Sequence, residues 1–594
     1  MKPTMEILER INQNSLKNKD EIFTRLFRYL LREDLYFVAY KNLYANNGAS
    51  TKGVDDDTAD GFSVEYIRKI IKSLEDNTYS PKPVRRTYIE KSNGKMRPLG
   101  IPTFTDKIVQ EVLRMILEAV YEPNFLEISH GFRPNRSCHT ALSSIKKEFN
   151  GTKWFIEGDI KGCFDNINHT KLIEIIGQKI KDARLIQLIH KFLKAGYLEE
   201  WKYNATYSGV PQGGIISPIL TNIYLHELDK YIMEIKKSFD KQASRKYTPQ
   251  YNVIRGKVER LAKKIKYASE EDKPLIIEEW KTARKEMLAT PSKMNDDKKL
   301  KYVRYADDFL VAINGSKEDC DKIKSQLIAF VKNTLKMELS DEKTYITHSN
   351  EKAQFLGYDI VVRRNNETKP QGNYTSRTLN NKVQLLIPLE RKVQKFLFSN
   401  GIVEVKNNNI EPCKRGVLTI LTDLEIVSTY NAELRGICNY YNLASNFYKL
   451  SYFSYLMEYS CLKTLAAKHK TTIAKIKEKY KGANGKWTIP YETKEGKKYM
   501  YFANYKECKK NTYVNDEISK EILYHLHTTT TFESRLKANK CELCGNTKSK
   551  RYEVHHINKV KNLSGKKYWE QIMIAKRRKT LVVCEECHKK IHSN

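Results

Sequence analysis

Three aspartates stand where a metal-dependent reaction on phosphates could take place. Asp159 lies at the end of the apolar run KWFIEGDI (153–160), and Asp307 and Asp308 lie together inside KYVRYADDFLVAI (301–313). Mg²⁺ prefers carboxylate oxygens as ligands. Two such ions about 4 Å apart can activate a hydroxyl group and stabilise a leaving phosphate. The pattern predicts a nucleotidyl-transfer site, although an Asp-Asp pair by itself is also typical of a polar turn.

A second group of chemically capable residues follows residue 540. Two C-x-x-C pairs there have the spacing of a structural zinc site with four thiolate ligands. Histidines lie between and after the pairs, in EVHHINKV (553–560) and CHKKIH (587–592). Such histidines suit the binding of one divalent ion and the activation of water. The alternative is a DNA-binding zinc knuckle with surface histidines. The residues concerned are Cys541, Cys544, Cys584, Cys587, His555, His556, His588 and His592.

The apolar pattern around the aspartates predicts the elements that hold them. Residues 153–160 have the pattern of a short buried strand, and 301–313 that of a hairpin with the two aspartates at or near its tip. Residues 81–102 predict a second, basic hairpin. A helix is expected to begin near Pro218, because the apolar residues after it repeat at helical spacing. Residues 236–300 are polar with one amphipathic stripe, which predicts a helical insertion on the surface.

Length and composition favour a large protein that binds a polyanion. The 594 residues are too many for one core, so several domains are expected. The formal net charge is +34, which favours nucleic acid as a partner and an anionic membrane surface as the second choice. The longest apolar runs are too short to span a bilayer. Seven cysteines are scattered singly, so reduced thiols plus one metal site are expected in place of a disulfide framework.

Seven motifs along the chain together resemble group II intron-encoded reverse transcriptases, a family in which they occur in this order. No single motif is specific, but chance does not produce this sequence of seven. The motifs are KSNGKMRPLGIP (91–102), HGFRPNRSCHTAL (130–142), EGDIKGCFDNI (157–167), SGVPQGGIISPIL (208–220), YADD (305–308), ELSDEKTYI (338–346) and FLGYDI (355–360).

The resemblance implies a multidomain α/β protein built around a right-hand polymerase. Fingers and a ferredoxin-like palm are expected at 1–360, and an α-helical thumb, the maturase X domain, at 361–480. A DNA-binding region is expected at 481–540. A small zinc-braced ββα-metal HNH endonuclease domain is expected at 541–594. In the thumb, tyrosines interleaved with basic residues at 434–470 suit RNA binding.

By position in the motifs, the resemblance also implies roles in polymerisation. Asp159, Asp307 and Asp308 would hold two Mg²⁺ ions. Lys91 and Arg97 would bind the incoming triphosphate, as cations on a hairpin can. Phe164 would exclude ribonucleotides by a clash with the 2′-hydroxyl, and Gln212 would line the nucleotide pocket. Without the resemblance, core packing and loop support would be the expected roles of Phe164 and Gln212.

In the C-terminal module, resemblance to HNH nucleases implies that His556 is the general base. His555, His588 and His592 would bind one divalent ion, and the four cysteines would bind a structural Zn²⁺. The central Asn of the motif departs from the family, because Thr580 stands where Asn is expected. Asn558 and Asn562 are both open as substitutes. KRRK (576–579) suits contact with DNA phosphates.

The function implied is that of a reverse transcriptase, maturase and DNA endonuclease that moves an intron. The partners implied are group II intron RNA, target double-stranded DNA and dNTPs, with no membrane, and a homodimer is compatible. A bacterial cytoplasmic location is expected, at the nucleoid when on DNA. One alternative is a splicing cofactor without polymerase activity, against which the intact aspartates argue. Another is a stand-alone reverse transcriptase, which would lack the thumb motif and the HNH module.

Overall fold

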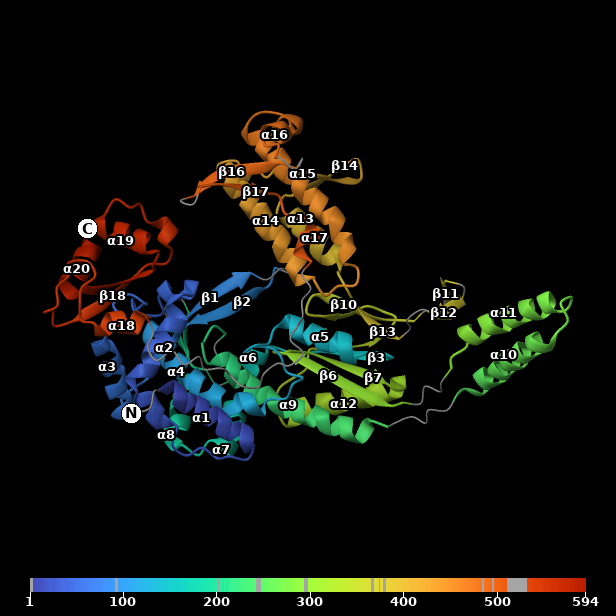
Figure 1. Cartoon of the computed structure of the whole chain (residues 1–594). Helices are drawn as coiled ribbons and strands as arrows, with labels where there is room; N and C mark the ends of the chain where they lie inside the picture. Colours follow the sequence, from blue (N-terminus) through green and yellow to red (C-terminus); the bar gives the residue numbers. More distant parts are fainter. Residues whose placement is uncertain are drawn as a thin grey trace.

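The structure is a computed structural model that describes residues 4–90, 94–199, 202–206, 208–210, 212–241, 247–292, 297–364, 368–372, 374–377, 381–482, 486–493, 496–509 and 531–593. Within these ranges the fold is mixed α/β (Figure 1). No helix among them is both long and apolar enough to cross a membrane.

A four-stranded antiparallel sheet holds the three aspartates. Its strand order is β6-β7-β3-β8. Along β3, Ile156 faces one hydrophobic core and Phe155 faces another, because successive side chains of a strand point to opposite faces. The predicted buried strand and the predicted hairpin are therefore confirmed. The strands are β3 (Trp154–Asp159), β6 (Lys299–Tyr305), β7 (Asp308–Asn314) and β8 (Tyr345–His348).

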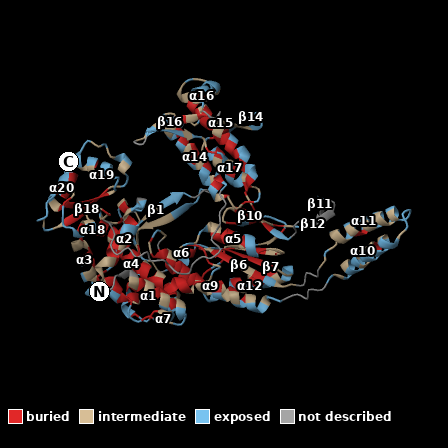
Figure 2. Ribbon diagram, viewed as in Figure 1, coloured by how far each residue is buried: buried red, intermediate tan, exposed pale blue. Residues whose placement is uncertain are grey.

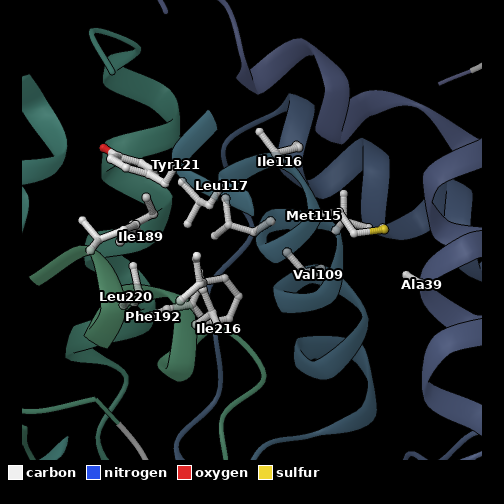
Figure 3. Close-up of a cluster of buried hydrophobic side chains, with 14 of the residues drawn as sticks. Ala39, Val109, Met115, Ile116, Leu117, Tyr121, Ile189, Phe192, Ile216 and Leu220 are labelled. Carbon is white, nitrogen blue, oxygen red and sulfur yellow. The ribbon is translucent and has the colours of Figure 1, made fainter. Parts of the chain in front are cut away.

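Long helices of the first core support this sheet and continue beyond its edge. Figure 3 shows side chains of α4 and α8 packed against the segment that leads into α9. Fifteen of the eighteen residues of α4 are buried, which is unusual for a helix and marks it as the centre of this core. The helices are α1 (Thr4–Lys17), α2 (Glu33–Tyr44), α3 (Val64–Glu75), α4 (Phe104–Tyr121), α7 (His169–Lys179), α8 (Ala183–Lys194), α9 (Ser217–Phe239) and α12 (Lys317–Asn333).

The predicted basic hairpin is also present and is largely exposed. It consists of β1 (Val84–Glu90) and β2 (Met96–Ile101), and it joins β4 (Tyr197–Glu199) and β5 (Lys202–Asn204) in a second sheet. The surface insertion is a pair of helices, α10 (Pro249–Tyr267) and α11 (Lys273–Ala289), that projects away from the rest of the chain (Figure 1).

The region after residue 353 differs from the prediction. Helices were expected over 361–480, but the first fifty residues of this stretch contain mostly strands. Strand β10 crosses position 360 and pairs with β13, so the domain boundary expected there lies inside a sheet. The strands are β9 (Ala353–Phe355), β10 (Tyr358–Arg363), β11 (Thr368–Gln371), β12 (Tyr374–Arg377), β13 (Lys382–Leu386), β14 (Val403–Lys406) and β15 (Asn409–Pro412).

The helical part of this region begins with a short π-helix, Leu389–Gln394, which continues into α13 (Lys395–Ser399). Its body is α14 (Asp423–Tyr440), α15 (Leu450–Lys468) and α16 (Ile473–Lys479). The hairpin β16 (Thr488–Thr493) and β17 (Gly496–Tyr501) packs on α14, together with α17 (Tyr505–Cys508). All of these share the second core with α5 (Cys138–Glu148), which packs against β6 and β13.

The C-terminal module packs against the N-terminal helices, although the two lie at opposite ends of the sequence (Figure 1). Phe532 stacks on Tyr40 with ring centroids 4.8 Å apart, and Phe62 forms a β-bridge to Val554. Buried residues of both ends belong to one hydrophobic core, as the continuous buried zone in Figure 2 indicates. The elements are α18 (Thr531–Lys537), β18 (Tyr552–His556), α19 (Tyr568–Lys576), β19 (Thr580–Cys584) and α20 (Glu585–Ser593).

A fully buried ion pair fixes the hairpin β6–β7 to α9. Arg304 on β6 donates from Nε and Nη2 to the two carboxylate oxygens of Asp229, at 2.7 and 2.6 Å, and both side chains are 0% exposed. The same guanidinium donates from Nη1 to the backbone carbonyl of Ala306 at 2.9 Å. Because every donor direction is used, the pair offsets its desolvation cost and positions the turn that carries the aspartates.

Loss of one partner should therefore be expensive. Asp229→Ala leaves the Arg304 charge buried and unpaired, so we expect a loss of about 3–5 kcal/mol in the free energy of unfolding. Arg255→Ala is the matched control, because it breaks an exposed ion pair with Glu259 within α10 and should cost below about 0.5 kcal/mol. Urea unfolding followed by tryptophan fluorescence measures both, and equal small losses would show that the buried pair does not hold the hairpin.

Candidate functional site

Asp159 and Asp308 face each other across two neighbouring strands. They are direct partners in the antiparallel register of β3 and β7, and Asp307 precedes Asp308 in the turn. The turn is tight, because Ala306 has a φ of +56°. A side chain at Gly131 would approach the Ala306 nitrogen to 2.2 Å, so only glycine fits beneath the turn. The three predicted aspartates are thus brought to one end of the sheet.

The charges of this group repel one another. Partial desolvation, followed by the charge of Asp307 and a hydrogen bond with Asp159, raises the pKa of Asp308 to about 7. Burial, and then the charge of Asp159, raises the pKa of Asp307. Such shifts mark a place where an additional positive charge would be stabilising. The donor set is all oxygen, which fits Mg²⁺.

One cation already lies among the carboxylates. Lys343 Nζ donates to Asp159 Oδ2 at 2.6 Å. The positive charges of Lys343 and Arg97 offset part of the rise in the pKa of Asp307. The sequence did not predict a role for Lys343, although the motif at 338–346 contains it. Its signal was a lysine directly after the acidic run in ELSDEKTYI, where a strand returns to the sheet.

An open pocket links the aspartates to the region after residue 353. Asp159, Asp308 and Lys343 line one part of it, and Arg391 and Lys392 of the π-helix line another. The pocket therefore runs from the carboxylates to basic residues that can contact a phosphate backbone.

The predicted nucleotide-binding residues have different surroundings. Arg97 is exposed on β2, close enough to affect the pKa of Asp307. Gln212 donates from Nε2 to Asp165 at 3.4 Å, and both line a second pocket under the hairpin β1–β2. Phe164, in the short helix α6 (Cys163–Asn166), is half-buried and makes an edge-on ring contact with Phe132. Lys91 lies outside the described residues.

The four cysteines come together as predicted. Their sulfur atoms all lie within 4.8 Å of one another, and Cys544 Sγ is 3.7 Å from Cys584 Sγ. Thiolates 2.3 Å from a tetrahedral Zn²⁺ are roughly 3.8 Å apart, so the cluster has the size of a zinc site. Burial and the neighbouring thiols raise the pKa of Cys587, which means that bound metal would have to displace protons.

The three predicted metal-binding histidines also come together, with a carboxylate that the sequence did not indicate. His555, His588 and His592 have nitrogen atoms within 4.8 Å of one another and of Asp60. Asp60 precedes His556 by 496 positions, and no local pattern links it to the module. Burial opposes the charged form of His588, but hydrogen bonds to Asp60 and Glu553 outweigh it and raise the pKa of His588 to about 9.

His556, the predicted base, points toward the N-terminal helices. Its Nε2 lies 3.0 Å from the backbone oxygen of Tyr44, and its backbone N–H donates to Asp60 Oδ1 at 2.6 Å. Burial lowers the pKa of His556, which favours the neutral ring that a general base requires. Asn558, one of the two open substitutes for the missing Asn, accepts a hydrogen bond from Ser50 at 3.0 Å.

Three family models match the chain. The reverse transcriptase (RNA-dependent DNA polymerase) model matches 89–248 and 277–360, the type II intron maturase model 380–531, and the AI2M/AI1M-like HNH endonuclease model 541–588. The group II intron-encoded protein LtrA of Lactococcus lactis subsp. cremoris is 58% identical over 100% of this chain and 99% of its own length.

The chain belongs to the group II intron-encoded proteins. It is an RNA-directed DNA polymerase, a maturase and an HNH endonuclease, as the sequence predicted. A 91 kDa protein in the cob intron of Schizosaccharomyces pombe is 36% identical over 95% of this chain and 69% of its own. Apo telomerase from Candida tropicalis is structurally similar with a TM-score of 0.30 and 16% identity, over 52% of this chain and 61% of that one.

The raised pKa of Asp308 predicts a pH-dependent stability. A carboxyl group with a pKa of about 7 in the folded protein and near 3.8 in the unfolded chain destabilises the fold progressively as pH rises between these values. Asp308→Asn removes that penalty. In the presence of EDTA we expect its melting temperature to exceed that of the wild type by roughly 2–4 °C at pH 8, about 1 kcal/mol after solvent screening of this exposed residue.

The same comparison at pH 4 should give equal melting temperatures, because Asp308 is then protonated in the folded protein. Differential scanning calorimetry at both pH values checks this. A difference that is the same at pH 4 and pH 8 would mean that the carboxylate charge is not its cause.

Proposed function

We propose that the sheet β6-β7-β3-β8 is a polymerase palm, the hairpin β1–β2 part of its fingers, and α14 to α16 its thumb. Asp159, Asp307 and Asp308 are the proposed ligands of two Mg²⁺ ions. The ions would activate the primer 3′-hydroxyl and stabilise the leaving pyrophosphate. The observation that carries this proposal is that Asp159 and Asp308 face each other beside Asp307, whose pKa is also raised.

In this proposal the surrounding residues bind the nucleotide and its template. Arg97 reaches the triphosphate from the exposed hairpin, next to Asp307. Gln212 and Phe164 line the base and sugar side. Lys343 offsets part of the charge of Asp159 and would contact a phosphate oxygen of the nucleotide. Arg391 and Lys392 then lie along the nucleic-acid backbone.

We further propose that α15 presents an RNA-binding surface. Tyr452 and Tyr455 are 55% and 47% exposed and stack with ring centroids 6.2 Å apart. Tyr455 contacts Tyr459, over whose ring Lys477 Nζ lies at 4.8 Å. Exposed aromatic rings next to cations suit stacking on unpaired bases and contact with phosphates. Intron RNA is the proposed ligand, which agrees with the maturase match over this segment.

In the C-terminal module, the cysteines are proposed to bind structural Zn²⁺. His555, His588 and His592 are proposed to bind one divalent ion, and His556 to accept a proton from the attacking water. Together the three activities serve intron mobility. The intron RNA inserts into one DNA strand, the nuclease cuts the other, and the polymerase extends from that 3′ end. A splicing cofactor without polymerase activity is the second candidate, and the acidic site at the sheet argues against it.

Primer extension tests the polymerase site. The wild type should extend a DNA primer on an RNA template with dNTPs and Mg²⁺, and Asp307→Ala combined with Asp308→Ala should lower the rate by at least about 10³-fold. Splicing assistance should remain in the variant, because α15 is unchanged. A double variant that polymerises normally would exclude this site. An inactive wild type, even with cognate intron RNA, would favour the splicing cofactor.

A point variant tests the nuclease site. His556→Ala should abolish cutting of the second DNA strand and leave primer extension unchanged, because the two sites share no residue. Truncation is less suitable, since it would uncover Tyr40 and Phe62. Gel analysis of end-labelled target DNA measures cutting. Retained cutting in His556→Ala would remove this histidine from the reaction.

A further inference from the structure

The segment that carries Asp60 covers the nuclease site. It runs from residue 45, just after α2, to residue 61, just before α3, and has only one short 3₁₀ helix, Asn47–Ser50. We call it the covering segment. Its contacts with the module are polar: Lys579 Nζ donates to the Ala45 carbonyl at 3.1 Å, and Ser50 Oγ donates to Asn558 at 3.0 Å.

Asp60 is the point at which the covering segment meets the three histidines. Its Oδ2 lies 2.8 Å from His592 Nε2 and 3.2 Å from His588 Nε2, and its Oδ1 lies 3.2 Å from His555 Nδ1. The two ring nitrogens of His588 and His592 are 3.3 Å apart. Nitrogen and oxygen ligands 2.0–2.1 Å from a tetrahedral ion are roughly 3.3 Å apart. The four side chains therefore have the spacing of a complete coordination sphere.

Two further observations favour these nitrogens as metal ligands. Glu553 forms a hydrogen bond with Nδ1 of His588, so Nε2 is the ring nitrogen that faces the other histidines and Asp60. A carboxylate behind a histidine is the usual arrangement at metal sites. His555 is 4% exposed; its Nε2 has no hydrogen-bond partner, and the only partner of its Nδ1 among the described residues is Asp60 Oδ1, 3.2 Å away. A buried ring nitrogen without a hydrogen-bond partner is costly unless it binds something.

A catalytic metal site keeps one coordination position open for water or substrate, whereas a closed set of four protein ligands is typical of a structural site. Asp60 takes that position here. His556 is also covered, because its Nε2 contacts the Tyr44 carbonyl and the residue is 8% exposed. Asp60 thus keeps water and DNA from the fourth position at the ion, and Tyr44, the residue directly before the covering segment, covers the base, whereas the side chain of His592 is 55% exposed.

We propose that Asp60 is the fourth ligand of the nuclease ion and that the covering segment holds the nuclease closed until a DNA phosphate replaces this carboxylate. The proposal rests on the proposed role of the three histidines. One anionic oxygen replaces another at the ion, so the charge at the site is conserved. The DNA backbone would also compete for Lys579, which now binds the covering segment. Target binding and opening of the site are thereby coupled.

Metal binding tests the ligand. Full-length protein with zinc at the cysteines is titrated with Co²⁺, whose visible absorption reports the number of ligands. Asp60→Ala should weaken Co²⁺ binding by about 10-fold or more and lower the absorption intensity. Asp56→Ala is the matched control, because Asp56 is 92% exposed in the same segment and should leave both unchanged. Equal binding by wild type and Asp60→Ala would overturn the proposal.

Nicking of supercoiled plasmid DNA, at saturating divalent ion and without intron RNA, tests the closure. Asp60→Ala should nick at least about 10-fold faster than wild type and Asp56→Ala, and adding His556→Ala should abolish the gain. A rate no higher than that of the wild type overturns the closure. If His556→Ala alone cuts target DNA normally, the nuclease assignment itself fails, which separates the two outcomes.

A cross-link tests the closure in a second way. It remains informative if Asp60→Ala lowers the melting temperature, because the oxidised and reduced forms of one protein are compared. Ser50→Cys with Asn558→Cys should join the covering segment to the module on oxidation, since these side chains touch. In the Asp60→Ala background, oxidation should suppress nicking and reductant should restore it. Asp60→Ala without the new cysteines, oxidised in parallel, controls for the zinc ligands. A cross-linked protein that nicks as fast as its reduced form would overturn the proposal.

Discussion

The buried pair of Arg304 and Asp229 is the interaction on which the proposed polymerase site depends. The three aspartates repel one another, and two of them, Asp307 and Asp308, stand at a turn that requires a positive φ at Ala306. A hairpin under such strain needs an anchor elsewhere. Arg304 supplies it two residues before the turn, through Asp229 on α9 and the Ala306 carbonyl. The repulsion among the aspartates is therefore tolerated, because the Arg304–Asp229 ion pair stabilises the hairpin directly beneath them.

The two proposed metal sites, at the sheet and at the histidines, balance their charges in different ways. At the sheet, the carboxylates remain beside an open pocket and one lysine offsets part of their charge. In the C-terminal module, His555 and His588 are buried, His592 is exposed, and a carboxylate from a distant segment faces all three. An open acidic site suits a substrate that brings its own metal-bound triphosphate. A site that a carboxylate of the same chain already occupies suits a reaction that must not occur on every DNA the protein meets.

Local patterns were sufficient to predict the elements that carry the aspartates. The alternation around Asp159 and the turn at Asp307 are readable because strand periodicity and turn chemistry act over a few residues. The C-x-x-C pairs were readable for the same reason. The strands after residue 361 were missed, since each is only four or five residues long, which is too short for a clear period. The partners of Arg304 and the position of Asp60 were not predictable, because they depend on contacts between segments far apart in the chain.

The shared core of the two chain ends has a consequence for synthesis. Tyr40 and Phe62 obtain part of their packing from Phe532 and Val554, which leave the ribosome almost five hundred codons later. At about 5–20 residues per second this delay is on the order of 25–100 s. During that time the first helices expose an apolar surface that only the last residues can cover. A message broken near its 3′ end would thus yield a chain marked by that surface for chaperones or proteolysis, before it could act on any chromosome.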